Sequence, residues 1–255
     1  MKNRLNKKGQ ITIFVIMAAV IVAALVLFFL IYRPPTIVGG QEFNDPESFL
    51  DTCLRNEIRD KVDVMLPQGG FVNPVDYALY DDIKVAYVCK NVNYYETCVT
   101  QYPVYISTIE QELEKELQET VEGCFLLLED ELDKRNYEHS GGDVSIDITL
   151  KPGIVETVIY RDFYLSKDEF SKDFSSFRIG LKSPVYDLAY VAQEISSKEA
   201  EYCYFEYEGY MLVHPEIDIK KNTLSDSTNI YTITRKKTGE TLNIAVKGCV
   251  IPPGY

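Results

Sequence analysis

An unbroken apolar run dominates the hydropathy pattern close to the N-terminus. Residues 11–32 contain no charged side chain. A helix of this length, at about 1.5 Å per residue, spans roughly 33 Å, and the hydrocarbon core of a bilayer is about 30 Å thick. Two prolines follow the run and end the helix. We therefore expect a transmembrane helix over residues 10–33, preceded by a basic leader (1–9) and followed by a tether (34–43).

The charges on the two sides of this run predict its orientation. Four basic residues lie within the first nine positions, whereas only Arg33 follows the run closely. Because positive charge is enriched on the cytoplasmic side, we expect the N-terminus in the cytoplasm and residues 44–255 outside the cell. A cleaved secretory signal has a shorter apolar region, of about 7–15 residues, and a small-residue cleavage site. The pattern therefore favours a retained helix that contacts membrane lipid through residues 11–32 over a signal peptide or a buried helix.

Three stretches of the exterior part have apolar residues at three- and four-residue spacings, which predicts helices. The first opens at Asp45-Pro46, an acidic N-cap followed by proline at the first helical position, and runs to about residue 66. The second covers about 104–134, and the third runs from 183 to about 203. Between the first two helices, residues 67–104 are rich in Asn, Asp, Tyr and Pro, and we interpret them as a long loop with short extended pieces.

The period of the pattern changes to two after the second helix, which predicts strands. A turn at Lys151-Pro152-Gly153 separates two alternating stretches and indicates a hairpin, and Gly239 marks the turn of a second hairpin. The expected strands are 143–150, 154–164, 174–181, 229–235 and 240–247.

The order of these elements predicts the fold class. Helices come first, then strands, one more helix and a last pair of strands. This order favours an α+β domain over a doubly wound parallel sheet. We expect an exterior domain over 44–255 that is helical over 44–138 and strand-rich with one helix over 143–255, with about three helices and antiparallel hairpins in all.

The composition is that of a folded chain with an acidic surface. Of 255 residues, 46% are hydrophobic and 25% are charged, which is typical of a globular protein. The formal net charge is -13, although four of the basic residues are in the first nine positions. Nucleic-acid binding depends on Lys and Arg that neutralise phosphates. An acidic exterior domain therefore makes a nucleic-acid partner improbable.

All six cysteines follow the apolar run. On the oxidising side of a membrane, an even number of cysteines predicts a disulfide framework, for which several pairings are possible. A bridge between Cys89 and Cys98 would close a short local loop. Cys53 and Cys124 lie on the apolar stripes of two expected helices that could face each other. Context therefore favours Cys53–Cys124, Cys89–Cys98 and Cys203–Cys249, while the sequence alone leaves other pairings open.

Motifs of catalysis and metal binding are not found in the sequence. It contains no G-x-S-x-G, P-loop, G-x-G-x-x-G or H-E-x-x-H motif. Zinc would require closely spaced Cys or His ligands, and the two histidines, His139 and His214, are far apart. We therefore expect no metal, no cofactor and no catalytic residue, and a protein that is not an enzyme.

Three weaker candidates have simpler structural interpretations. Asp143 and Asp147 lie on one face of an expected strand, but in so acidic a chain such pairs arise by chance on a solvated face. Residues 201–210 are aromatic and acidic and could bind carbohydrate or protein. Packing of their tyrosines onto the core is the simpler interpretation, and His214, before Pro215, is interpreted as structural.

The start of the apolar run carries a resemblance to a known family. The sequence KKGQITIF, at residues 7–14, resembles the processing site of archaeal type IV prepilins, which have a class III signal peptide. The resemblance implies cleavage between Gly9 and Gln10 by a prepilin-type peptidase. The sequence departs from the pilin pattern at the fifth mature position, which is Phe14 where many pilins have a Glu that helps subunits register in a filament. A plain single-pass anchor is the alternative interpretation.

Further stretches resemble a group of archaeal membrane-anchored surface proteins. They are KKGQITIF itself, the segment 53–71 and the segment 230–254. This resemblance implies a shared architecture without implying an activity. We expect a single-pass cell-membrane protein, pilin-like, with its bulk extracellular, that acts in adhesion, in a filament or in envelope interaction with other surface proteins. The alternative is a plain anchored extracellular enzyme or ligand-binding domain with an unrecognised site.

Overall fold

A computed structural model describes residues 45–250, together with Met17 and Ile21. The helices of the described residues are α2 (Pro46–Met65), η1 (Leu66–Gln68), α3 (Tyr105–Lys134), α4 (Val185–Tyr202) and α5 (Tyr207–Val213). The strands are β1 (Tyr77–Tyr80), β2 (Ile83–Lys90), β3 (Val99–Thr100), β4 (Glu138–Gly141), β5 (Ser145–Lys151), β6 (Ile154–Lys167), β7 (Phe170–Lys182), β8 (Ile217–Thr223), β9 (Asn229–Arg235) and β10 (Thr241–Lys247). The prediction of an α+β fold with antiparallel hairpins and disulfides is confirmed.

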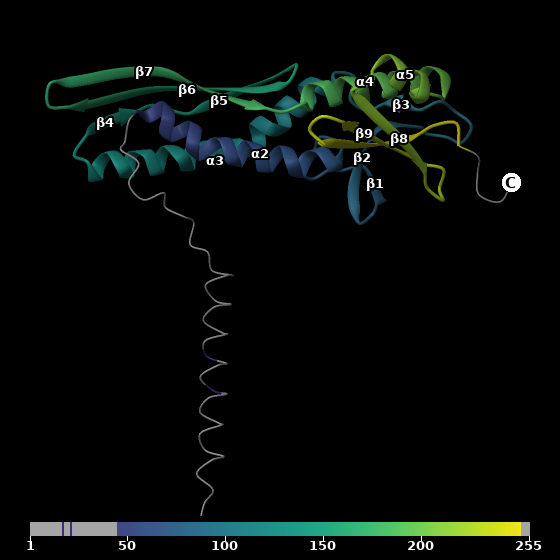
Figure 1. The fold of residues 1–255 in the computed structure, drawn as a ribbon, viewed down its shortest axis with the longest axis horizontal. Coiled ribbons are helices and arrows are strands. Elements are labelled where there is room, and N and C mark those ends of the chain that lie inside the picture. Colours follow the sequence, from purple (N-terminus) through teal and green to yellow (C-terminus); the bar gives the residue numbers. More distant parts are fainter. Residues whose placement is uncertain (1–16, 18–20, 22–44, 251–255) are drawn as a thin grey trace, which may run out of the picture. The chain divides into compact units, whose positions relative to one another are not determined.

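Helices α2 and α3 lie side by side and form the helical layer of the domain (Figure 1). Each has a stripe of apolar side chains at four-residue spacing, which places the stripe along one face of the helix. These side chains are buried. They are Leu50, Leu54, Ile58 and Val62 on α2, and Ile109, Leu113, Leu117 and Val121 on α3.

The antiparallel sheet is built around β6, which pairs with β7 along one side and with β5 and then β4 along the other. Its inner face packs on the two helices through aromatic rings, with the Phe125 ring of α3 5.4 Å from that of Phe177 and 6.1 Å from that of Phe163. The register of β6 against β7 shifts between Tyr160 and Phe163. Such a β-bulge bends the strand locally.

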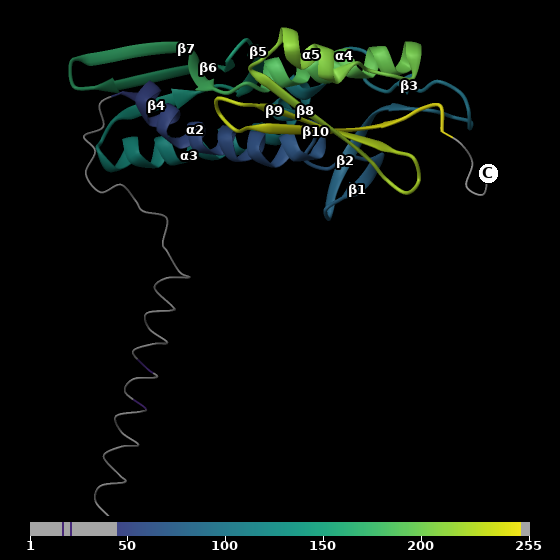
Figure 2. The same ribbon diagram turned by 45° about the vertical axis from the view of Figure 1, so that its right-hand side comes forward.

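The second sheet is mixed and has the order β1-β2-β10-β9-β8, with β3 also paired to β2. Strands β2 and β10 are parallel, and the other pairs are antiparallel. Helices α4 and α5 lie against this sheet (Figure 2). The Ser196 hydroxyl of α4 donates a 3.1 Å hydrogen bond to the Val88 carbonyl of β2, which fixes the helix over the strand.

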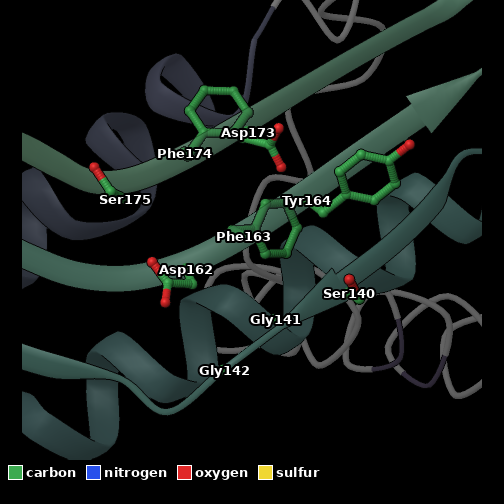
Figure 3. Close-up of a pocket in the computed structure, with 9 residues that line it drawn as sticks. All are labelled: Ser140, Gly141, Gly142, Asp162, Phe163, Tyr164, Asp173, Phe174 and Ser175. Carbon is green, nitrogen blue, oxygen red and sulfur yellow. The ribbon is translucent and has the colours of Figure 1, made fainter.

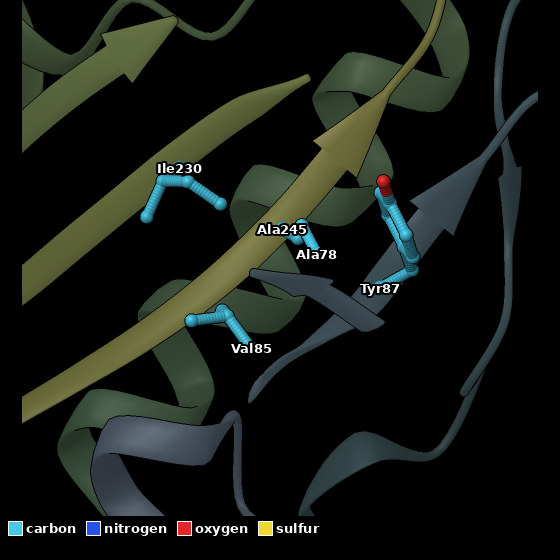
Figure 4. Packing of buried hydrophobic residues seen from close by; sticks show 5 residues of the cluster. All are labelled: Ala78, Val85, Tyr87, Ile230 and Ala245. Carbon is cyan, nitrogen blue, oxygen red and sulfur yellow. The ribbon is translucent and has the colours of Figure 1, made fainter. Parts of the chain in front are cut away.

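The other face of the mixed sheet has its own apolar cluster (Figure 4). Side chains at neighbouring positions of a strand point to opposite faces, so Ile230 points away from α4 while Tyr231 points toward it. The cluster consists of Ala78, Val85, Tyr87, Ile230 and Ala245. Both faces of this sheet are therefore buried.

Several short elements differ from the prediction. The segment 67–104, expected as a loop within a helical half, contains β1, β2 and β3. Helix α5 and strand β8 were not expected, so the described residues have four α-helices where about three were predicted, and the strand-rich half has two helices. The reason is length and pattern: α5 has seven residues, too few for an apolar stripe, and β8 buries only Ile217 and Ile219.

Candidate functional site

The six cysteines form three disulfides in the pairs favoured from the sequence. Cys53 of α2 is joined to Cys124 of α3, with Cα atoms 6.1 Å apart. The bridge Cys89–Cys98 closes a short loop beside β2, and the bridge Cys203–Cys249 joins the end of α4 to the residues after β10. The described residues contain no free cysteine. The cysteines therefore staple the domain and are not available as thiolate nucleophiles.

The predicted processing site and membrane segment lie outside the described residues. This applies to Gly9 and Gln10, to the leader 1–9, to the helix expected over 10–33 except for Met17 and Ile21, and to the tether 34–43. Within the described part of the chain, no helix is long and apolar enough to cross a membrane.

A cavity of about 480 Å³ opens at the bulge of the antiparallel sheet (Figure 3). The backbone there is held by Gly142, whose N–H donates to the Asp162 carbonyl at 2.9 Å and whose carbonyl accepts a bond from Arg161. The lining residues come from β4, β6, β7 and the residue after β4. They are Ser140, Gly141, Gly142, Asp162, Phe163, Tyr164, Asp173, Phe174 and Ser175.

The charged side chains that line this first cavity are all acidic. Its charged lining groups are two carboxylates, Asp162 and Asp173, and no basic side chain lines it. Within residues 45–250, no group of three or more His, Cys, Asp or Glu side chains is placed to hold a metal ion. The cavity is therefore a wide acidic hollow without the convergent, mixed groups of a specific binding site.

A second cavity, of about 270 Å³, lies where α4 and α5 meet the ends of β8 and β9, and we call it the tyrosine groove. Tyr186 and Tyr190 are four residues apart on α4, so their rings share one face of that helix. Tyr210 of α5 and His214, directly after that helix, have the same spacing, and their rings stack with centroids 4.3 Å apart. The groove is lined by Tyr186, Asp187, Tyr190, Val191, Tyr210, His214, Glu216, Ile217 and Arg235.

Charged groups of both signs meet at one end of the tyrosine groove. The Glu216 carboxylate lies 3.5 Å from the Arg235 guanidinium and 3.9 Å from Nδ1 of His214. Burial, together with the negative charge of Glu194 and the neighbouring Tyr190 and Glu216, raises the pKa of Tyr210 to about 12. Its hydroxyl is therefore protonated at neutral pH and can donate a hydrogen bond.

Most polar groups of the tyrosine groove have bonding capacity to spare. Within the described residues, the hydroxyls of Tyr186, Tyr190 and Tyr210 and the carboxylate of Asp187 have no hydrogen-bond partner. Arg235 has five N–H donors and forms one ion pair there, with Glu216. The groove thus offers both donors and acceptors beside aromatic rings.

A buried polar cluster ties α4 to the mixed sheet, nearer the C-terminal end of the helix than the groove residues are. The Glu199 carboxylate accepts a hydrogen bond from the Tyr231 hydroxyl of β9 and lies 3.3 Å from the Lys221 ammonium of β8. Glu199 is 2% exposed, and Lys221 supplies the opposite charge beside it. Burial and the hydrogen bond to Glu199 raise the pKa of Tyr231. The cluster ties the helix to two strands of the mixed sheet.

The weaker sequence candidates have different positions in the structure. Asp143 and Asp147 are exposed, as expected of a solvated face. In the segment 201–210, Phe205 is buried, whereas Tyr210 lines the tyrosine groove. His214, interpreted from the sequence as structural, is half-exposed in the same groove.

Five polar residues of the groove were missed from the sequence: Tyr186, Asp187, Tyr190, Glu216 and Arg235. The two tyrosines gave a usable signal, since they are spaced four apart and lie off the buried stripe of their helix. Glu216 and Arg235 gave none, because only the pairing of β8 with β9 brings them together.

Comparison with known proteins gives no further guide to the site: no family model, curated protein or solved structure matches this chain. A functional proposal must therefore come from the sequence pattern and from the geometry of the domain. The tyrosine groove is the better candidate site, because it combines aromatic, acidic and basic side chains from four elements.

Proposed function

We propose that this chain is a single-pass membrane-anchored cell-surface protein, pilin-like at its N-terminus, whose exterior domain acts in adhesion, in a filament or in envelope interaction. The uncharged segment 11–32 is the anchor, and the basic leader holds the N-terminus in the cytoplasm. The domain that follows meets its partners outside the cell and has no enzymatic role.

The observation that carries the proposal is the distribution of the disulfides. All six cysteines follow the apolar segment, and all six are paired within the domain. Disulfides persist in oxidising surroundings and are rare in the reducing cytosol. A disulfide-stapled domain behind a membrane segment with a basic N-terminal flank supports an exterior location.

The test is the topology of the full chain in intact cells. Proteinase K is added from outside to cells that express the protein in an archaeal host with a prepilin-type peptidase. We expect the protease to degrade the domain in intact cells. In a parallel sample in which the protease cannot reach the outer surface, the domain should stay intact. Replacement of all four leader basics (Lys2→Glu, Arg4→Glu, Lys7→Glu and Lys8→Glu) is expected to reduce the exposed fraction. Protection of the wild-type domain in intact cells would contradict the proposal.

The pilin-like part of the proposal has a separate test. Intact mass and N-terminal sequencing of the membrane-extracted protein are expected to give a chain that begins at Gln10. The variant Gly9→Val is expected to remain uncleaved, and Gly39→Val, in the tether, serves as the matched control. A wild-type chain that retains Met1 or begins at Lys2 would leave a plain anchor.

A second candidate, an anchored ligand-binding domain, is favoured by the tyrosine groove. Aromatic side chains combined with a few convergent polar groups are typical of small-molecule sites. This candidate differs from the first in what the domain contacts and not in where it is located.

A further inference from the structure

We propose that the tyrosine groove binds a neutral sugar, one pyranose ring of a surface or environmental glycan. The inference deepens the ligand-binding candidate above. It rests on the proposed function only for the cellular location, outside the cell, at which the domain would encounter the glycan. The binding itself does not depend on that location.

The aromatic rings of the groove match the apolar faces of a pyranose. Such a ring has faces made of C–H groups, which are slightly positive, and the face of an aromatic ring is slightly negative. Tyr190 is 53% exposed on α4, and Tyr210 lines the same cavity from α5, stacked on His214. Two helices thus present aromatic side chains to one cavity. Its volume, about 270 Å³, is just below the range of about 300–1,000 Å³ for sites of drug-sized ligands and fits a single ring.

The charges of the groove select for an uncharged ligand. Its lining has two carboxylates, from Asp187 and Glu216, and one guanidinium, from Arg235. The net charge of these three groups is negative, which penalises an anionic ligand, and a cationic ligand would compete with the Arg235 guanidinium for Glu216. Sugar hydroxyls can donate to the carboxylates and accept from the guanidinium at the same time, without leaving a charge uncompensated.

The groove is also held in place before any ligand arrives. Its apolar base, Val191 and Ile217, is 3% and 2% exposed and belongs to the core. The Ile219 N–H of β8 lies 3.1 Å from the Met211 sulfur of α5, and the Lys236 ammonium donates to the Pro215 carbonyl at 2.9 Å. A site built on fixed elements loses less ordering entropy on binding. The acidic hollow of Figure 3, by contrast, has no basic side chain in its lining that could donate a hydrogen bond to a sugar hydroxyl.

The experiment measures sugar binding by the full chain in a detergent without a sugar headgroup, since a maltoside or glucoside would compete for the groove. The probes are neutral gluco-, manno- and galacto-oligosaccharides, with sialylated and amino-sugar oligosaccharides as the charged comparison. Saturation-transfer NMR detects contact, and titration of tyrosine fluorescence gives the affinity, because the chain has no Trp. We expect at least one neutral series to bind and the charged probes to bind less tightly.

Variants of the groove separate stacking from a general effect on the fold. Tyr190→Ala is expected to weaken binding about tenfold, whereas Tyr190→Phe keeps the ring and stays within about threefold of wild type. Arg235→Gln is expected to weaken binding as well. The control is Tyr160→Ala, since Tyr160 is similarly exposed, at 50%, but lies on β6; it should bind like wild type.

Several results would overturn the sugar site. One is the absence of saturable binding for every neutral probe, and another is tighter binding of a charged probe. A third is an unchanged affinity in Tyr190→Ala. The last is a protein that binds through the groove and is not displaced by neutral sugars. The outcome is independent of the topology experiment. Sugar binding by a protein whose domain is protected in intact cells would remove the surface function alone, and exposure without sugar binding would remove this inference alone.

Discussion

The two sheets of the domain protect themselves in different ways. The antiparallel sheet has one covered face, and its edge strand β5 is sealed by side chains of α3. Glu110 and Glu114 accept hydrogen bonds from the backbone N–H groups of Leu150 and Ile148, at 2.7 and 2.9 Å. Unpaired edge groups are a template for association with another chain, and here a row of helix carboxylates occupies them.

The mixed sheet is covered on both faces, by α4 with α5 on one and by the cluster of Figure 4 on the other. Its central strands accordingly have nearly continuous burial: β10 buries all five residues from Leu242 to Val246. Two of the three disulfides have a cysteine in or directly after one of its strands.

The difference shows where a site can form. The sheet with a free face has a wide hollow at the bulge of β6, and the charged side chains in its lining are all acidic. A sheet covered by two helices has a seam between them, and side chains from both helices and from the strand ends converge there. The predictions that follow test whether the two sheets are stabilised independently of each other, as their contacts indicate.

The largest effect is expected from the bridge between the two long helices. Cys53→Ser with Cys124→Ser opens a bridge with a sequence separation of 71 and should lower the free energy of unfolding by about 4 kcal/mol. Cys89→Ser with Cys98→Ser, with a separation of 9, should cost about 2.5 kcal/mol, because a short loop restricts the unfolded chain less. Urea unfolding of the full chain in detergent, followed by tyrosine fluorescence, measures both. Equal losses would show that loop closure does not set their contribution.

A somewhat smaller effect is expected from the polar cluster under α4. Glu199→Ala leaves the Lys221 ammonium and the Tyr231 hydroxyl without their partner and should cost about 3 kcal/mol. The control is Glu201→Ala on the same helix, whose exposed carboxylate lies 4.0 Å from Lys198 and should contribute less than about 1 kcal/mol. If both variants unfold at the same urea concentration, the buried cluster does not hold α4 on the sheet.

The sealed edge gives a third test, on the other sheet. Glu110→Ala with Glu114→Ala removes two hydrogen bonds to the backbone of β5 and should cost about 2 kcal/mol. It should also promote self-association, which sedimentation velocity in detergent would detect. Glu119→Ala, an exposed position of the same helix, is the control. A variant that remains as stable and as monodisperse as this control would show that the carboxylates do not protect the edge.

The smallest expected effects are two pH dependences of opposite sign. Burial raises the pKa of Glu110, with Glu114 and Asp147 adding to the shift and the Leu150 N–H opposing it. Its contribution to stability is therefore full below its unfolded pKa, near 4.5, and is lost as pH rises through the higher folded pKa. Asp226 behaves in the opposite way: burial opposes ionisation, but bonds from Lys247 and Thr228 outweigh it and lower the pKa.

The stability that Asp226 contributes is present above its unfolded pKa, near 3.8, and is lost as pH falls through the lower folded pKa. Urea midpoints measured at several acidic pH values for wild type, Glu110→Gln and Asp226→Asn would separate the two. The wild-type protein should lose stability at low pH as Asp226 is protonated, and Asp226→Asn should not show this loss. The wild-type protein should also lose stability between acidic and neutral pH as Glu110 ionises, and Glu110→Gln should not show that loss. Shifts of the same sign in both variants would contradict the assignment.

Long elements of the domain were predictable from the sequence because their apolar stripes repeat over several turns. The helix expected over 104–134 agrees with α3 within a residue, and the hairpin around Gly153 has the expected turn. The pairing of Cys53 with Cys124 followed from the same stripes, since each cysteine lies beside apolar residues of its own helix. The groove was not predictable in the same way, because its residues come from four elements separated by turns.

By itself, then, the sequence determined what depends on local periodicity and spacing: the uncharged segment near the N-terminus, the long helices and the hairpins, while it favoured the cysteine pairs without excluding others. The tertiary structure decided what depends on contacts between distant segments: the parallel pairing of β2 with β10, the sealed edge of β5, the buried partners of Glu199 and the meeting of Tyr190, Tyr210 and Arg235. The physical reason is that a periodic pattern reports which face of an element is buried, whereas the choice of what covers that face is made only when the elements pack.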